Sequence, residues 1–296
     1  GFVEGADFSA NGKTIATVAR DYTIKLWDTD GMELQTIQCP RSFLYSVVFA
    51  PNCPNCIQTG ATLLTASEDK TARIWSLQSN SIRSQEDEIF SATYSPNGKY
   101  IVSTSRNKKA ILWDVNGRKI TELPGHQGMV NSAAFSPNSD QIITASADSS
   151  AKIWNIDGRE RITLTGHHEA LTGAVFNHSD KHQWALTSSK DKTARLWETS
   201  GKLIRTFIGH TQTVESAAFS PNDKYVLTAS RDSTAKVWRT GNGQLLQTLV
   251  GHEAAVVDAA FSPDGKFIIT ASRDKTARLW SIDGRLLHIL AGHTDV

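Results

Sequence analysis

Histidine, serine and aspartate recur together four times in this chain, and they are the side chains that form the catalytic triad of many hydrolases. Each set also includes a tryptophan six residues after the aspartate. The four complete sets are His126, Ser146, Asp148 and Trp154; His167, Ser189, Asp191 and Trp197; His210, Ser230, Asp232 and Trp238; and His252, Ser272, Asp274 and Trp280.

The repetition of these sets argues against catalysis. A catalytic triad is built once, with an exposed nucleophile and an oxyanion hole. Four copies at fixed spacing are typical of a structural network, because a buried Asp or His must be hydrogen-bonded to be tolerated. We therefore expect no catalytic residue and no enzymatic activity. An enzyme with its active site on the axis of the fold is the disfavoured alternative.

The tryptophans extend the repeat over the whole chain. Seven of them are spaced by 48, 38, 41, 43, 41 and 42 residues: Trp27, Trp75, Trp113, Trp154, Trp197, Trp238 and Trp280. Asp stands six residues before six of these, and Asn107 takes its place once. A period near 42 residues indicates one supersecondary unit copied seven times.

The unit consists of four short apolar runs separated by turn residues. In one copy they are V-E-S-A-A-F-S-P from residue 214, Y-V-L-T-A-S from 225, A-K-V-W from 235 and Q-L-L-Q-T-L-V from 244. Asn-Gly and Asp-Gly pairs between the runs supply the positive φ angles of tight hairpins. The pattern predicts a four-stranded antiparallel meander with strands a to d. Because a lone meander buries neither face, we expect seven of them to stack into a closed ring.

Five Gly-His pairs, the Ser-Pro closing strand a and the terminal tryptophans resemble WD40 repeats over essentially the whole chain. The resemblance implies an all-β, seven-bladed β-propeller of four-stranded antiparallel blades, in which His, Ser, Asp and Trp form a buried hydrogen-bonded tetrad. It also implies one domain over residues 1–296. The expected blades are approximately 2–38, 43–85, 88–124, 129–165, 170–208, 213–250 and 255–291. The near-identical D-K-T-A-R-L-W runs are similar to bacterial repeat arrays in larger signalling proteins.

The first three copies depart from the pattern. Ala19 replaces Ser in the first, so its tetrad is expected to lack one hydroxyl. His293 follows the last blade, and by position it should serve the first blade beside Asp21 and Trp27. We therefore expect the termini to lie close together and the junction of blades 1 and 7 to be the least stable part of the ring.

Two other clusters could bind metal. Cys53-Pro-Asn-Cys56 looks like half a zinc site or a redox pair, but no second pair exists, and Cys39 is expected on the opposite face. His178 and His182 flank Asp180 in a polar connection. We expect exposed loops at both places, with no metal and no cofactor.

The resemblance places partner binding on the top face, which carries the d–a and b–c loops. Aromatic residues gather there in blades 1 to 3, namely Phe2, Phe43, Tyr45 and Phe90, and Arg20 and Arg106 stand before the tetrad position. Exposed aromatics with arginine are typical of interface hot spots. Two alternatives are that the rings fill gaps left by missing tetrads, and that Arg20 and Arg231 pair with Glu4 and Glu215 of their own blades.

Composition limits the class of partner. Lys plus Arg is 31 and Asp plus Glu is 30, which gives a net charge of +1 and no overall basic field for nucleic acid. A local basic arc of Arg20, Lys190, Arg231 and Arg273 keeps nucleic acid as an alternative partner. No apolar run approaches the ~20 residues that cross a bilayer. The odd number of cysteines favours a reducing, cytoplasmic setting.

We therefore predict a non-catalytic scaffold that binds a protein or peptide. We expect it to be monomeric as a domain, and the resemblance implies that it serves as the interaction or sensor part of a larger signalling protein. The chain opens on Gly1-Phe2 without Met, as an excised piece would.

Overall fold

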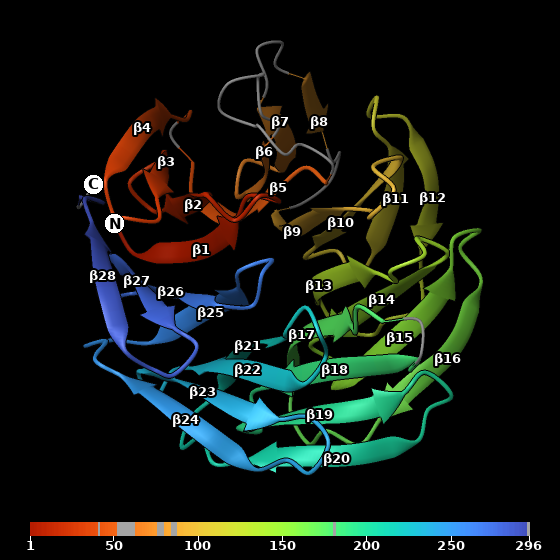
Figure 1. Cartoon of the computed structure of the whole chain (residues 1–296). Helices are drawn as coiled ribbons and strands as arrows, with labels where there is room; N and C mark the ends of the chain where they lie inside the picture. Colours follow the sequence, from red (N-terminus) through yellow and green to blue (C-terminus); the bar gives the residue numbers. More distant parts are fainter. Residues whose placement is uncertain (41, 52–62, 76–79, 84–87, 180–181, 295–296) are drawn as a thin grey trace.

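The computed structural model describes the chain except residues 41, 52–62, 76–79, 84–87, 180–181 and 295–296. The described strands form seven four-stranded antiparallel sheets arranged as the blades of a ring (Figure 1). The chain is an all-β, seven-bladed propeller, as predicted. Each blade takes its four strands from one continuous segment, in the order a to d from the axis outward.

The strand bounds follow the repeat. Blades 1 to 3 consist of β1 (Val3–Phe8), β2 (Thr14–Ala19), β3 (Thr23–Asp28) and β4 (Glu33–Gln38); β5 (Leu44–Phe49), β6 (Leu63–Ser67), β7 (Thr71–Trp75) and β8 (Asn80–Arg83); and β9 (Ile89–Tyr94), β10 (Tyr100–Ser105), β11 (Ala110–Asp114) and β12 (Lys119–Leu123). Blades 4 and 5 consist of β13 (Val130–Phe135), β14 (Gln141–Ser146), β15 (Ser150–Asn155) and β16 (Glu160–Thr165); and β17 (Leu171–Phe176), β18 (Trp184–Ser189), β19 (Thr193–Glu198) and β20 (Leu203–Ile208). Blades 6 and 7 consist of β21 (Val214–Phe219), β22 (Tyr225–Ser230), β23 (Thr234–Arg239) and β24 (Leu245–Val250); and β25 (Val256–Phe261), β26 (Phe267–Ser272), β27 (Thr276–Ser281) and β28 (Leu286–Ala291).

The hydrophobic core lies between the blades. One cluster joins Ile143 and Ile153 of blade 4 to Leu171, Phe176 and Trp197 of blade 5, all of them buried. Strand b is covered on both faces, and β22 is buried from its second residue onward, whereas the outermost strand β24 of the same blade is exposed or half-buried except at Leu249. The apolar runs of strands a to c therefore form strands that pack against two neighbouring blades.

The outer rim repeats a second interblade contact. The turn between strands c and d carries a glycine at positive φ, such as Gly201 at +100°, which suits a residue without Cβ. A Cβ built on Gly201 would lie 2.7 Å from Ile162 Cδ1 of the preceding blade. The turn glycines Gly31, Gly158, Gly201, Gly243 and Gly284 thus let their blades approach strand d of the neighbouring blade closely.

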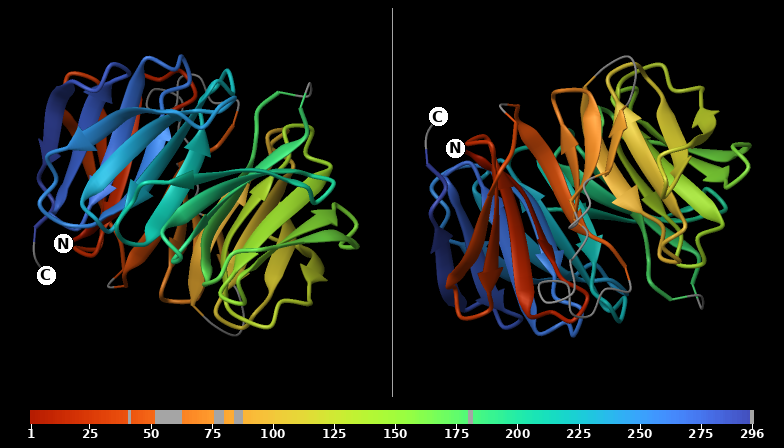
Figure 2. Two further views of the ribbon diagram at one scale, coloured as in Figure 1. Left: turned by 90° about the horizontal axis from the view of Figure 1, so that it is seen from below. Right: turned by 90° about the horizontal axis from the view of Figure 1, so that it is seen from above.

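The ring closes by packing blade 1 against blade 7. Val3, Phe8 and Trp27 share one buried cluster with Leu279 and Leu290. The two ends of the described chain meet at this junction (Figures 1 and 2), as expected: the Thr294 N–H donates to Asp21 Oδ2 at 2.9 Å, and Gly1 lies against the backbone of Arg20 and Asp21. No strand is exchanged between the ends, so side-chain packing and hydrogen bonds that involve side chains hold these two blades together.

Candidate functional site

A hydrogen-bonded chain of four side chains links each regular blade to the loop that enters it. In blade 4, His126 Nδ1 lies 2.9 Å from Asp148 Oδ2, and His126 Nε2 lies 2.8 Å from Thr144 Oγ1. The Trp154 indole N–H donates to the same Thr144 oxygen at 2.9 Å. With Asp ionised, His Nδ1–H donates to Asp, and the Thr hydroxyl donates to Nε2.

The hydroxyl between His and Trp belongs to Thr144, which corrects the expectation for Ser146. Side chains two apart on a strand share a face, so both hydroxyls point the same way. Trp154 pairs with Ile142 in the register, and its ring reaches one such step to Thr144 but not two steps to Ser146. Ser146 Oγ instead accepts the Asp148 N–H at 3.1 Å. The same correction applies to Ser189, Ser230 and Ser272, where the bridging residues are Thr187, Thr228 and Thr270.

The displaced serines still tie the turn to the loop that enters the blade. Ser189 Oγ donates to the carbonyl oxygen of Glu169 at 3.0 Å and accepts the Asp191 N–H at 3.1 Å. Ser272 does the same with Ala254 and Asp274. Each regular blade therefore carries two hydroxyls with different contacts: the Thr hydroxyl bridges His and Trp, and the Ser hydroxyl bonds the backbone at the turn before the Asp.

Blade 1 completes its chain with a residue from the far end of the sequence. His293 Nδ1 lies 2.9 Å from Asp21 Oδ2, and its Nε2 lies 2.9 Å from Thr17 Oγ1. Trp27 donates to Thr17 Oγ1 at 2.8 Å. Placing His293 in the first blade was therefore right. The expected missing hydroxyl was wrong, because Thr17 supplies it and Ala19 replaces only the serine of the turn.

In blades 2 and 3, the Trp still donates to a buried hydroxyl, but among the described residues no His bonds to that hydroxyl. Trp75 donates to Thr65 Oγ1 at 2.9 Å, and Trp113 donates to Ser103 Oγ at 2.8 Å. In blade 3, the Ser105 hydroxyl donates to Asn107 Oδ1 at 2.6 Å. These two blades are the irregular ones, as the sequence indicates.

The electrostatics of the chain suit a structural role. Burial tends to raise the pKa of Asp148, but hydrogen bonds from Ser150, the Gln127 N–H and His126 outweigh it and lower that pKa to about 2. Burial lowers the pKa of His126, against the opposing effect of Asp148. The histidine is therefore neutral beside an ionised Asp near pH 7. Because Thr144 is fully buried, the set offers no accessible nucleophile.

On the top face, Arg20 lies between two aromatic rings. Its Cζ is 5.8 Å from the ring centroid of Phe2 and 5.3 Å from that of Phe43, both within cation–π range. Arg20 Nε also donates to Glu4 Oε1 at 2.6 Å. Phe2 is 40% exposed, and Phe43 is half-buried, with Tyr22 stacked on it at 5.6 Å.

Tyr45 and Phe90 form a second aromatic pair at the mouth of the channel. Their rings meet edge-to-face with centroids 5.9 Å apart, and both side chains are half-buried. Burial, followed by the charges of Glu88 and Glu68, raises the pKa of Tyr45. Arg106 reaches Glu88 at 3.4 Å with its side chain 57% exposed. Of the four rings proposed for partner binding, Phe2 and Phe43 flank Arg20, whereas Tyr45 and Phe90 contact each other. Arg106 pairs with Glu88 on the blade that carries Phe90.

The basic arc is largely neutralised within the top face. Arg20 and Arg273 both contact Glu4, at 2.6 and 3.7 Å. Arg231 forms an ion pair with Glu215. The interpretation that Arg20 and Arg231 pair with acids of their own blades is confirmed. Lys190, the fourth member of the arc, is exposed.

The first strands of all seven blades surround a central channel of about 370 Å³. Its lining contains Glu4, Asp7, Glu215 and Asp258, and no Lys, Arg or His among the residues that line it. Asp7 and Asp258 belong to none of the motifs of the repeat; Asp258 stands in an otherwise apolar strand, and Asp7 shares its strand with Glu4.

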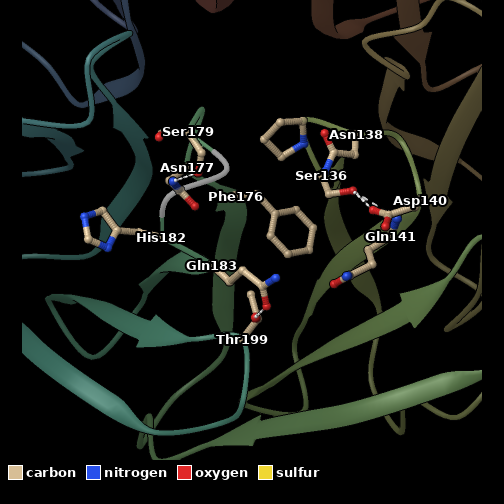
Figure 3. A pocket seen from close by; sticks show the side chains of 11 residues that line it. Ser136, Asn138, Asp140, Gln141, Phe176, Asn177, Ser179, His182, Gln183 and Thr199 are labelled. Carbon is tan, nitrogen blue, oxygen red and sulfur yellow. Dashed lines mark hydrogen bonds between the residues drawn. The ribbon is translucent and has the colours of Figure 1, made fainter.

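A smaller pocket of about 80 Å³ lies between blades 4 and 5 (Figure 3). The Phe176 ring points into it, and polar side chains surround it, including Ser136, whose hydroxyl donates to Asp140 at 2.7 Å. His182 on its edge stacks on Trp184 with centroids 4.1 Å apart. His178 lies 3.3 Å from Asp223 of blade 6. Asp180 lies outside the described residues.

No group of three or more His, Cys, Asp or Glu suited to a metal ion occurs in the part of the chain that the structure describes. Cys53 and Cys56 lie outside that part. Cys39 is a half-buried free thiol, and burial raises its pKa to about 12, so the thiolate that reacts or binds metal is scarce at neutral pH.

The repeats match the WD domain, G-beta repeat (WD40) family at residues 1–28, 31–76, 78–114, 117–155, 158–198, 201–239 and 243–281. The chain belongs to the WD40 repeat family. Most matched units begin near strand d of one blade and end at strand c of the next. This offset explains why the His of blades 4 to 7 precedes the blade in which it forms its hydrogen bonds.

Among curated proteins, the chain is 29% identical to transcription initiation factor TFIID subunit 5 of Caenorhabditis elegans over 135 residues, which is 42% of this chain and 20% of that protein. It is 41% identical to nuclear distribution protein nudF of Aspergillus flavus over 73 residues, 25% of this chain and 13% of that protein. These matches therefore span a fifth or less of each relative. Among the described residues, no helix is long and apolar enough to cross a membrane.

Proposed function

We propose that this WD40 propeller is a non-catalytic scaffold that binds a protein or peptide partner on the top face of blades 1 to 3. The observation that carries the proposal is the guanidinium of Arg20 held between Phe2 and Phe43, with Phe2 open to solvent. Aromatic rings beside an arginine are the usual make-up of interface hot spots.

The rings are positioned before any partner arrives. Tyr22 stacks on Phe43, Phe90 meets Tyr45 edge-to-face, and Glu4 fixes Arg20 through an ion pair. Side chains held in this way lose little conformational freedom on binding, which reduces the entropic cost of association. Arg106 extends the surface onto blade 3.

The named relatives are consistent with such a role. One is by its name a subunit of a transcription initiation factor, and another is a nuclear distribution protein. We extend the proposal to a propeller that acts as the interaction or sensor part of a longer signalling protein, monomeric as a domain and cytoplasmic.

Nucleic acid is the second candidate partner, because Lys190 and the arginines lie on the same face. The ion pairs of Arg20, Arg231 and Arg273 with glutamates disfavour it, since a paired arginine has less charge to offer a phosphate. An enzyme is disfavoured because the repeated hydroxyl, Thr144 in blade 4, is buried in a fixed hydrogen-bond chain.

The test compares proteins captured from an extract of the source cell by three forms of the chain. They are the wild type, a top-face variant Phe2→Ser/Phe90→Ser, and a rim variant Ile208→Ser/Val250→Ser. Ile208 and Val250 are 74% and 70% exposed on outer strands and serve as the matched control. We expect a partner that the top-face variant loses and the rim variant retains. A partner lost only by the rim variant would contradict the proposal, and salt-dependent retention of DNA or RNA would favour the second candidate.

A further inference from the structure

Where the ring closes, two carboxyl groups in the channel accept hydrogen bonds from backbone N–H groups of the neighbouring blade. The Ala6 N–H of blade 1 donates to Asp258 Oδ2 of blade 7 at 3.4 Å. The Phe49 N–H of blade 2 donates to Asp7 Oδ2 of blade 1 at 2.9 Å. Each carboxyl also accepts the N–H of its following residue, Ala259 or Phe8, at 2.9 Å.

These carboxyls are specific to the closing part of the ring. At the position of Asp258, the other first strands carry glycine or serine: Gly5, Ser46, Ser91, Ser132, Gly173 and Ser216. At the position of Asp7 they carry Val48, Thr93, Ala134, Val175, Ala218 and Ala260. Ser216 makes the neutral equivalent of the bond, because its Oγ accepts the Ala259 N–H of the next blade at 3.2 Å.

No basic group balances the two carboxyls. Among the described residues, no Lys, Arg or His forms an ion pair with Asp7 or Asp258, and the charge that acts on Asp7 is that of Asp258. The other titratable groups on the adjoining first strands are Glu4 on β1, Tyr45 on β5 and Glu215 on β21. Both glutamates form ion pairs with arginines at the channel mouth, Glu4 with Arg20 and Glu215 with Arg231. Strands β2 and β26, which pack behind, carry no titratable side chain.

We propose that Asp258 and Asp7 form a proton-sensitive closure of the ring. When both are ionised, their mutual repulsion and their half-buried position in the channel wall loosen the junctions of blade 1 with blades 7 and 2. When one takes up a proton, the interblade N–H bond to a carboxyl oxygen remains and the repulsion is removed. The closure then tightens.

The direction of the effect follows from where the groups titrate. Burial raises the pKa of Asp7 to about 7, with the Asp258 charge adding to it and the N–H bonds of Phe49 and Phe8 opposing it. Burial raises the pKa of Asp258 to about 6, against its N–H and Ser216 hydrogen bonds. The folded ring therefore binds protons more tightly than the unfolded chain. The stabilisation is full below about pH 4 and is lost as pH rises through 6 to 7.

Hydrogen exchange of the whole chain at about pH 5.5 and about pH 8, corrected for the intrinsic exchange rate, tests this directly. We expect protection of the β1 and β25 amides to fall about tenfold or more toward the higher pH, relative to β17 on another part of the ring. In Asp7→Asn/Asp258→Asn this pH dependence should vanish, since neither amide ionises. Asp30→Asn, in an exposed turn of blade 1, is the matched control and should keep it.

An unchanged pH dependence in the double variant would overturn the proposal, and so would equal loss of protection in β17. If the double variant does not fold, a ¹³C carboxyl NMR titration of the wild type decides instead. Two aspartates titrating between about pH 5.5 and 7.5 support the closure, and aspartates that all titrate below about pH 5 contradict it.

Discussion

His293 Nδ1 lies 2.9 Å from Asp21 Oδ2, although 272 positions separate these residues in the chain. This contact gives blade 1 the same Asp–His–Thr–Trp chain that blades 4 to 7 take from the segment just before them. A side-chain network, rather than an exchanged strand, therefore joins the end of the sequence to its beginning.

The first prediction concerns this junction. His293→Ala removes the partner of both Asp21 and Thr17, so the junction of blades 1 and 7 should open first in hydrogen exchange, with faster exchange in β1 to β3 than in β17 to β19. His168→Ala, an exposed histidine, is the control and should leave the pattern unchanged. Uniform exchange across all blades in His293→Ala would contradict the expectation that this junction is the weakest.

The second prediction concerns the acid of the network. Asp191→Ala should lower the free energy of unfolding by roughly 1–3 kcal/mol, because it leaves His167 and the backbone N–H of His168 without their acceptor. Asp157→Ala, in an exposed turn, should change it by less than about 0.5 kcal/mol. Chemical denaturation measures both, and equal midpoints for the two variants would refute a structural role for Asp191.

The third prediction separates threonine from serine. Thr187→Val keeps the shape but removes the oxygen shared by His167 and Trp197, so it should cost about 1–3 kcal/mol. Thr211→Val at an exposed position is the control. Ser189→Ala should cost less than Thr187→Val, since it removes turn contacts nearer the solvent. A larger loss of stability for Ser189→Ala than for Thr187→Val in thermal unfolding would indicate that Ser189, and not Thr187, is the central hydroxyl of the network.

The repeat, the number of blades and the place of His293 could all be predicted, because fixed spacing along the chain encodes them. The bridging hydroxyl could not be predicted from the spacing of Ser146. Thr144 and Ser146 lie on the same face of β14, and only the pairing of Trp154 with Ile142 decides which hydroxyl the indole reaches. A signal was present nonetheless: Thr17 and Thr65 occupy the same place in copies where other members are missing.

The cross-blade bonds of the channel carboxyls could not be predicted from the sequence, for a different reason. Asp7 receives its interblade hydrogen bond from Phe49, 42 residues away, and Asp258 from Ala6, 252 residues away. The sequence presents each one only as an acid inside an apolar strand. Their shared surroundings exist only after the ring has closed.

The fourth prediction concerns acid unfolding. The pKa values of Asp148 and Asp191 are lowered to about 2, so the folded chain holds these protons less tightly than the unfolded chain. Their stabilisation is present above about pH 4 and is lost as pH falls toward 2. The thermal midpoint should therefore drop steeply in that range, and Asp148→Asn/Asp191→Asn should flatten the drop. An equally steep drop in that variant would contradict the assignment.

Site-specific photocrosslinking can show whether a partner binds the top face of blades 1 to 3, because it reports which residues the partner touches. A photoreactive phenylalanine analogue would replace Phe43 or Phe90 on the top face, and Ile208 or Val250 on the rim, each in the otherwise native chain. We expect crosslinks to a common partner protein from positions 43 and 90, and none to that protein from positions 208 and 250. Crosslinks to the partner from the rim positions alone would contradict it.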